Sequence, residues 1–112
     1  MGSTELDLVR GTFDLLVLKA LSWGPMHGLG VLRWIEQASR AQLQVTEGAL
    51  YPALHRLEQR GWLDAEWGVT ERKREAKFYR LTPDGRRALT AELSKWTRYT
   101  EAVGLVLAAP GA

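Results

Sequence analysis

The sequence predicts a mainly α-helical fold with one small β-hairpin and a long C-terminal helix. Apolar residues recur at three- and four-residue spacing in most of the chain, whereas the region after residue 61 shows the two-residue alternation of strands. The 112 residues, 46% of them apolar, suffice for one modest core. We therefore expect one compact unit, with a domain over residues 1–81 and the long helix within residues 82–112.

Two helices are expected before residue 41. The first has Thr12 as its N-terminal cap and the densely apolar residues 13–21 as its body, and a Gly-Pro pair at residues 24–25 ends it. The second spans residues 28–40, where apolar side chains recur on one face and predict a buried stripe. That stripe consists of Val31, Leu32, Ile35 and Ala38.

A third helix and a hairpin follow. Thr46 is suited to cap this helix, which ends near Arg60 and has an inward stripe of three leucines. Residues 62–69 alternate in polarity and residues 76–81 are rich in aromatic side chains, as expected of two strands. Residues 70–75, between the strands, are mostly charged, so the hairpin has a basic tip. The leucines of the stripe are Leu50, Leu54 and Leu57.

The last helix opens on Thr82, Pro83 and Asp84, and it runs to about Ala108. These three residues supply a cap, a first-turn proline and an acidic group near the positive end of the helix dipole. The predicted order is three helices, a hairpin and a long helix. This order is typical of a winged helix-turn-helix, in which the third helix enters the DNA major groove and the hairpin, or wing, touches the backbone nearby.

Charge is concentrated in the predicted hairpin. The formal net charge of the chain is +2, yet residues 71–80 contain five cationic side chains and two glutamates, a local excess of +3. Clustered cations of this kind suit phosphates, although a solubilising loop would have the same composition. The position of the cluster beside the third helix favours a role in binding nucleic acid.

Several functional classes are disfavoured by what the sequence lacks. The chain has no cysteine, which excludes disulfides and thiolate metal sites. The apolar residues 13–21 are too few to span a bilayer, and no basic start of a signal peptide precedes them, so we expect a cytoplasmic protein. His27 and His55 fall in different elements, with no catalytic or metal-binding motif around them. We therefore expect no enzyme, no cofactor and no metal, and we interpret His27 as a capping or packing residue.

Four segments together resemble the PadR family of transcriptional regulators: DLLVLKAL (14–21), GPMHGLG (24–30), EGALYPALHRLEQRGWL (47–63) and FYRLTPDGRRAL (78–89). The resemblance covers nearly the whole chain, and the last two segments are specific in combination. It implies a winged-helix repressor that dimerises through its last helix and binds DNA as a homodimer. In some members the affinity for DNA responds to small aromatic ligands. With a single terminal helix, the chain resembles the short-tailed subgroup.

The function expected from pattern and resemblance is sequence-specific DNA binding that regulates transcription, as a repressor on a pseudo-palindromic operator. Two positions depart from the family: Ala49 replaces a hydroxyl residue that would bind phosphate, and Leu29 replaces a tyrosine of many relatives. The alternative is a winged helix used as a protein–protein interaction module, since one fold serves both purposes. Such a module would present an apolar outward face on the third helix, and the polar face predicted here favours DNA.

The candidate DNA contacts lie on the third helix and the hairpin. With the leucine stripe inward, the outward face is flanked by Glu58 and carries six candidate contacts: Gly48, Tyr51, Pro52, His55, Arg56 and Gln59. Tyr51 can donate to a phosphate, and Arg56 can pair with a phosphate or a guanine. His55 and Gln59 can reach base edges. A merely solvated helix face is the plain alternative. In the hairpin the candidate phosphate contacts are Arg72, Lys73, Arg74 and Lys77.

The last helix carries an apolar seam that a core of this size does not cover, so we expect a second subunit to cover it. The expected dimerisation residues are Leu89, Leu93, Trp96, Val103 and Leu107. Two symmetric heads would then bind half-sites about one helical turn apart. Trp96 on this seam can stack on a planar aromatic effector, although packing alone also explains a tryptophan there.

Overall fold

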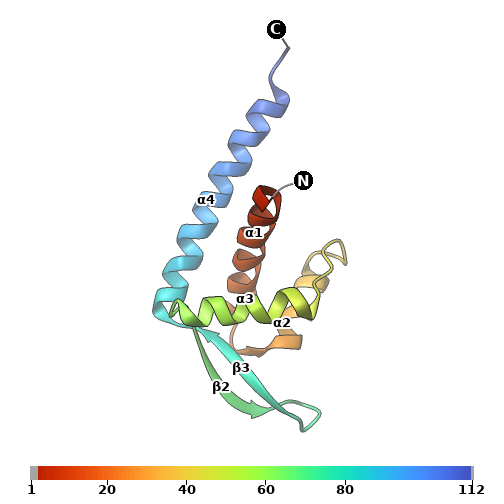
Figure 1. Cartoon of the computed structure of the whole chain (residues 1–112), viewed down its shortest axis with the longest axis vertical. Helices are drawn as coiled ribbons and strands as arrows, with labels where there is room; N and C mark the ends of the chain where they lie inside the picture. Colours follow the sequence, from red (N-terminus) through yellow and green to blue (C-terminus); the bar gives the residue numbers. More distant parts are fainter. Residues whose placement is uncertain (1–2, 112) are drawn as a thin grey trace.

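The computed structural model describes residues 3–111. In chain order its elements are α1 (Ser3–Leu21), β1 (Met26–His27), α2 (Gly28–Ala38), α3 (Glu47–Gln59), β2 (Leu63–Val69), β3 (Glu75–Leu81) and α4 (Pro83–Ala108). Helices α1 and α4 run side by side, and α3 crosses near their base (Figure 1). The β2–β3 hairpin projects beyond α3 at this same end, opposite the C-terminus (Figure 1). The molecule is accordingly elongated, with extents of 62 × 28 × 25 Å. The predicted fold class is confirmed.

The first helix is longer than the sequence pattern predicted. It begins at Ser3, so the expectation that Thr12 caps it was wrong, and Thr12 lies inside the helix. Residues 3–11 contain no proline, and the one glycine among them, Gly11, weakens a helix by only about 1 kcal/mol. A glycine and a threonine in sequence are therefore too weak a signal to start a helix when the residues before them are also helix formers.

The region around α2 differs from the prediction at both ends. The helix ends at Ala38 rather than Arg40, because Arg40 and Ala41 adopt the left-handed conformation, with φ of 53° and 61°. Before the helix, the two-residue strand β1 pairs antiparallel with β3, giving the sheet order β1-β3-β2. The sequence pattern missed β1 because two residues are too few to show an alternation.

The core lies where α1, α2 and α3 meet the sheet, and the leucine stripe predicted for α3 is confirmed. Leu50, Leu54 and Leu57 have no exposed surface. Each buried leucine of this kind contributes about 1.5–3 kcal/mol to folding relative to an exposed one. The Thr46 cap of α3 is also confirmed, since its Oγ1 accepts a hydrogen bond from the Ala49 N–H at 3.2 Å. Around this stripe pack Val17, Leu18, Leu21, Val31, Ile35, Leu63, Tyr79 and Leu81.

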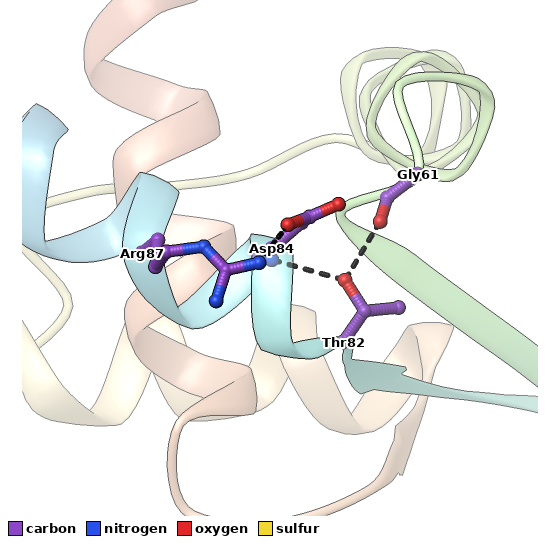
Figure 2. Close-up of polar contacts among 5 residues, drawn as sticks. Gly61, Thr82, Asp84 and Arg87 are labelled. Carbon is purple, nitrogen blue, oxygen red and sulfur yellow. Dashed lines mark hydrogen bonds and ion pairs between the residues drawn. The ribbon is translucent and has the colours of Figure 1, made fainter.

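A polar junction fixes the start of α4 against the end of α3. The Thr82 hydroxyl caps α4 by accepting a hydrogen bond from the Gly85 N–H at 3.0 Å, and it donates to the Gly61 carbonyl at 2.7 Å (Figure 2). Asp84 pairs with Arg87 one turn along the helix. A Cβ at Gly85 would lie 2.0 Å from the Trp62 carbonyl oxygen, so only glycine permits this approach. The predicted cap, proline and acid are therefore confirmed as the start of α4.

Candidate nucleic-acid interface

The outward face of α3 is polar and open because the inward face is filled with leucine. The buried stripe fixes the rotation of the helix about its axis, and the residues opposite it face solvent. The structure exposes five of the six outward residues that the sequence predicted. These are Gly48, Tyr51, Pro52, His55 and Gln59.

Tyr51 leans on the start of α2. A Cβ at Gly28 would lie 2.7 Å from Cε1 and 2.9 Å from the hydroxyl oxygen of Tyr51, so a larger residue there would displace the ring. Tyr51 nevertheless remains 45% exposed. Gly28 is the first residue of α2, and backbone N–H groups at a helix N-terminus favour anions. The Tyr51 hydroxyl therefore lies beside a helix end that suits a phosphate.

Pro52 lies within α3, and the helix continues through it. A proline ring crowds the residue four positions earlier in a helix, which here is Gly48. Apart from its own helix backbone, the nearest atom to a Cβ at Gly48 would be Thr46 Oγ1, 3.8 Å away. No side chain therefore crowds this part of α3, where Gly48 and Pro52 line a groove beside α1 and α4.

Arg56, the sixth predicted residue, lies differently from the other five. Its Nη2 donates to Asp14 Oδ1 of α1 at 2.8 Å, and the side chains are only 29% and 12% exposed. Its buried Nε has no hydrogen-bond partner within the part of the chain that the structure describes. The guanidinium thus links α3 to α1. Sequence reasoning missed Asp14, although a lone carboxylate within the apolar residues 14–21 was a signal that a cation would lie nearby.

Lys77 links the hairpin to α3. Its Nζ donates to Glu58 Oε1 at 3.1 Å and lies 5.5 Å from the centre of the Tyr79 ring. The hydrogen bond to Glu58 raises the pKa of Lys77, and burial raises the pKa of Tyr79. Part of the Lys77 charge is therefore already neutralised within the chain, and Glu58 is a second partner that the sequence pattern did not indicate.

The tip of the hairpin, residues 70–74, is a closed turn with free cations. The Thr70 N–H donates to the Arg74 carbonyl at 2.8 Å, and the Lys73 N–H donates to the Thr70 carbonyl at 2.8 Å. Lys73 has a φ of 59°, in the left-handed region. Arg72, Lys73 and Arg74 are all exposed, and no ion pair is found for them among the side chains of residues 11–111, which the structure describes. The turn therefore holds three cations at the far end of the wing.

The apolar seam predicted on α4 is largely uncovered. Leu89 is half-buried, whereas Leu93 (48%), Trp96 (40%), Val103 (36%) and Leu107 (80%) are exposed. Beside the seam, a groove of about 1040 Å³ lies between α1, α3 and α4. The rings of Trp96 and Tyr99 lie 6.4 Å apart at its α4 side. The groove is lined mainly by apolar side chains, among them Phe13, Leu16, Pro52, Trp96 and Tyr99.

The two histidines have separate roles in the fold. His27 Nδ1 accepts a hydrogen bond from the Gly30 N–H at 2.9 Å, and its ring stacks on Phe78 at 5.4 Å, which confirms its interpretation as a capping and packing residue. His55 stands on the exposed face of α3. Within residues 3–111, no three His, Cys, Asp or Glu side chains are grouped as a metal site would need. None of the helices in that range is long and apolar enough to cross a membrane.

Known proteins share this fold. Residues 17–91 match the family described as "Transcriptional regulator PadR-like family". The chain is 39% identical over 87 residues to the transcriptional regulator Rv3488 of Mycobacterium tuberculosis, covering 77% of each chain. It is similar to the solved structure of a PadR-family regulator from Eggerthella lenta, with a TM-score of 0.79 and 31% identity over 96% of this chain and 92% of that one.

A transcriptional regulator from Clostridium thermocellum is also similar, with a TM-score of 0.79 and 26% identity over 88% of this chain and 95% of that one. These matches confirm the resemblance that the four sequence segments indicated. They also confirm that the chain is a regulator of transcription rather than an enzyme. The chain belongs to the PadR-like family of transcriptional regulators.

Proposed function

We propose that this protein represses transcription in the cytoplasm by binding a pseudo-palindromic operator as a homodimer. The observation that carries the proposal is the exposed polar face of α3 beside a wing tip with three free cations. The α3 helix of each subunit enters the major groove, and each wing binds the flanking backbone. A protein–protein interaction module would need an apolar face on α3, and the leucines of that helix are buried.

The α3 contacts divide by chemistry. The Tyr51 hydroxyl, beside the first turn of α2, donates to a phosphate and sets the register on the duplex. His55 and Gln59 reach base edges and supply sequence preference. Gly48 and Pro52 keep that surface low enough for close approach. These assignments account for the five exposed residues of α3 that the sequence predicted as DNA contacts.

Arg56 is a positioning residue in this proposal. Its pair with Asp14 holds α3 against α1 and turns the guanidinium away from the exposed face. The direct cationic contacts come instead from Arg72, Lys73 and Arg74, with a smaller share from Lys77 because Glu58 already pairs with it. Each phosphate that a cation neutralises contributes about 0.9 to the slope of log K against log salt concentration.

The second subunit covers the seam of α4. A continuous apolar strip on an exposed helix is costly in water, and a symmetric copy of the same strip is its natural cover. The two heads then meet half-sites centred about 34–36 Å apart, one turn of the duplex. The groove of about 1040 Å³ is at the upper end of the volume of ligand pockets. Space left beside Trp96 after dimerisation suits a small planar aromatic effector.

Selection from random duplexes tests the proposal. The purified protein is incubated with a random-sequence pool at two salt concentrations, and the bound fraction is sequenced. We expect an enriched pseudo-palindrome for the wild type and no enrichment for a Tyr51→Ala, His55→Ala variant. The control is Ser94→Ala, an exposed change on α4 away from the seam, which should enrich the same sequence. Absence of enrichment with the wild type would favour the protein-interaction module.

A further inference from the structure

The wing carries an exposed tryptophan that neither the fold nor the cationic tip explains. Trp67 of β2 is 70% exposed. A tryptophan buries more apolar surface at an interface than almost any other side chain, so an exposed tryptophan beside a group of cations is a candidate contact residue. The indole makes no contribution to the buried core of this chain.

The register of the hairpin shows which way Trp67 faces. Trp67 is directly opposite Lys77, and side chains at such paired positions project from the same face of a sheet. Lys77 reaches Glu58 of α3, at 3.1 Å. Trp67 therefore lies on the same face of the wing as the Lys77 side chain that contacts α3, two residues before the end of β2 and close to the tip at residues 70–74.

The charges around Trp67 indicate what covers it. Lys77 flanks it on the same face, and the cations Arg72, Lys73 and Arg74 lie beyond it along the wing. Val69, the next residue on this face, is paired with Glu75, so an anion is less favoured there than at Trp67. An apolar ring between cations matches the minor groove of a duplex, where apolar sugar walls lie between two rows of phosphates.

We infer that Trp67 packs against deoxyribose in the minor groove that flanks each half-site, while the tip cations bind phosphates at the rim of that groove. The major and minor grooves alternate along a duplex, so a wing that projects past α3 reaches the minor groove next to the major groove that α3 occupies. The inference rests on the proposed DNA binding and adds an uncharged contact to it.

An uncharged contact has its own signature in salt dependence. Loss of a phosphate contact changes the slope of log K against log salt, whereas loss of apolar burial lowers K by the same factor at every salt concentration. We expect Trp67→Ala to lower the affinity about tenfold with an unchanged slope. By contrast, the Lys73→Ala, Arg74→Ala variant should lower the magnitude of the slope by about 1.8 for each wing.

The test measures binding to the enriched duplex with its natural flanks and to the same duplex cut at the outer ends of the half-sites. Trp67→Ala should weaken binding to the long duplex and leave binding to the short one unchanged, and Trp67→Gln should behave alike. The matched control is Trp23→Ala, since Trp23 is also 70% exposed but lies in the turn after α1 rather than on the wing. It should bind both duplexes as the wild type does.

Two results would overturn the inference while the proposed function stands. One is wild-type affinity of both Trp67 variants on the long duplex, and the other is an equal loss on the long and short duplexes. A changed salt slope in Trp67→Ala would likewise contradict an uncharged contact. If the wild type binds no duplex with salt-sensitive affinity, the proposed function itself fails, and the two failures are distinguishable.

Discussion

Helices α3 and α4 are both amphipathic, yet the chain completes the packing of only one of them. The apolar stripe of α3 is fully buried, whereas α4 buries Gly85 and Ala88 near its start and exposes apolar side chains along the rest. A helix whose apolar face is buried within its own chain leaves its polar face free to bind a ligand. A helix whose apolar face is exposed needs a partner to cover that face. The difference separates the surface proposed for DNA from the surface proposed for a second subunit.

The largest expected effect is at α4, whose apolar face is exposed. Val103→Glu with Leu107→Glu places two charges in the exposed seam, where burial without partners would cost several kcal/mol. We expect sedimentation at micromolar concentration to give the 12.6 kDa monomer for this variant and a dimer for the wild type. Ser94→Glu, on the other side of α4, should remain dimeric. A monomeric wild type would show that no second subunit covers the apolar seam of α4.

The next largest effect is at α3, whose apolar face is buried. Leu54→Ala removes a fully buried side chain, so the free energy of unfolding should fall by about 2–5 kcal/mol in urea denaturation. His55→Ala, its exposed neighbour on the same helix, should change the free energy by no more than about 0.5 kcal/mol. Equal losses of unfolding free energy in the two variants would contradict a buried face at Leu54 and an exposed face at His55.

The Asp14–Arg56 pair gives a smaller effect and separates bracing from DNA contact. Asp14→Ala leaves a largely buried cation unpaired and should lower the free energy of unfolding by about 1–3 kcal/mol, less than for a fully buried pair. Arg56→Met should keep the salt slope of DNA binding unchanged, because the guanidinium is turned toward α1. A slope that falls in magnitude by about 0.9 per subunit would instead show that Arg56 contacts a phosphate directly.

The smallest effect is a loss of stability at alkaline pH. The raised pKa values of Lys77 and Tyr79 mean that the folded chain holds these protons longer than the unfolded chain does. Their contribution is therefore complete below the ordinary values of 10.5 and 10.0 and is lost as pH rises through the raised values. Urea unfolding between pH 8 and about pH 11 should show a shallower decline for Tyr79→Phe than for the wild type. Parallel curves would contradict this origin.

Much of the fold could be predicted because its signals are local. The Thr46 and Thr82 caps and the leucine stripe each involve residues within a few positions of one another, and the structure bears them out. The start of α1 was missed because a threonine such as Thr12 can either cap a helix or lie within one, and the sequence pattern did not distinguish the two cases. The strand β1 was missed because its partner in β3 is about fifty residues away in the sequence.

The candidate surface was predictable in part for the same reason. Periodicity identified the exposed residues of α3, since one buried stripe fixes the opposite face. Periodicity placed Arg56 on the outward face because the position of a residue around the helix axis does not reveal a partner on another helix. Here that partner is Asp14 of α1. Glu58 and Gly28 were missed likewise, because each acts through a residue of a different element. Contacts between elements decide which charges remain free.

The most direct test of the account is the ratio of two dissociation constants at one salt concentration, for the enriched duplex and for a scrambled duplex of the same length. We predict that the wild type binds the enriched duplex at least about 10³-fold more tightly. The Tyr51→Ala, His55→Ala variant should lose most of this ratio while it keeps the salt-dependent binding of its wings. A wild-type ratio near one would contradict sequence recognition by the exposed face of α3.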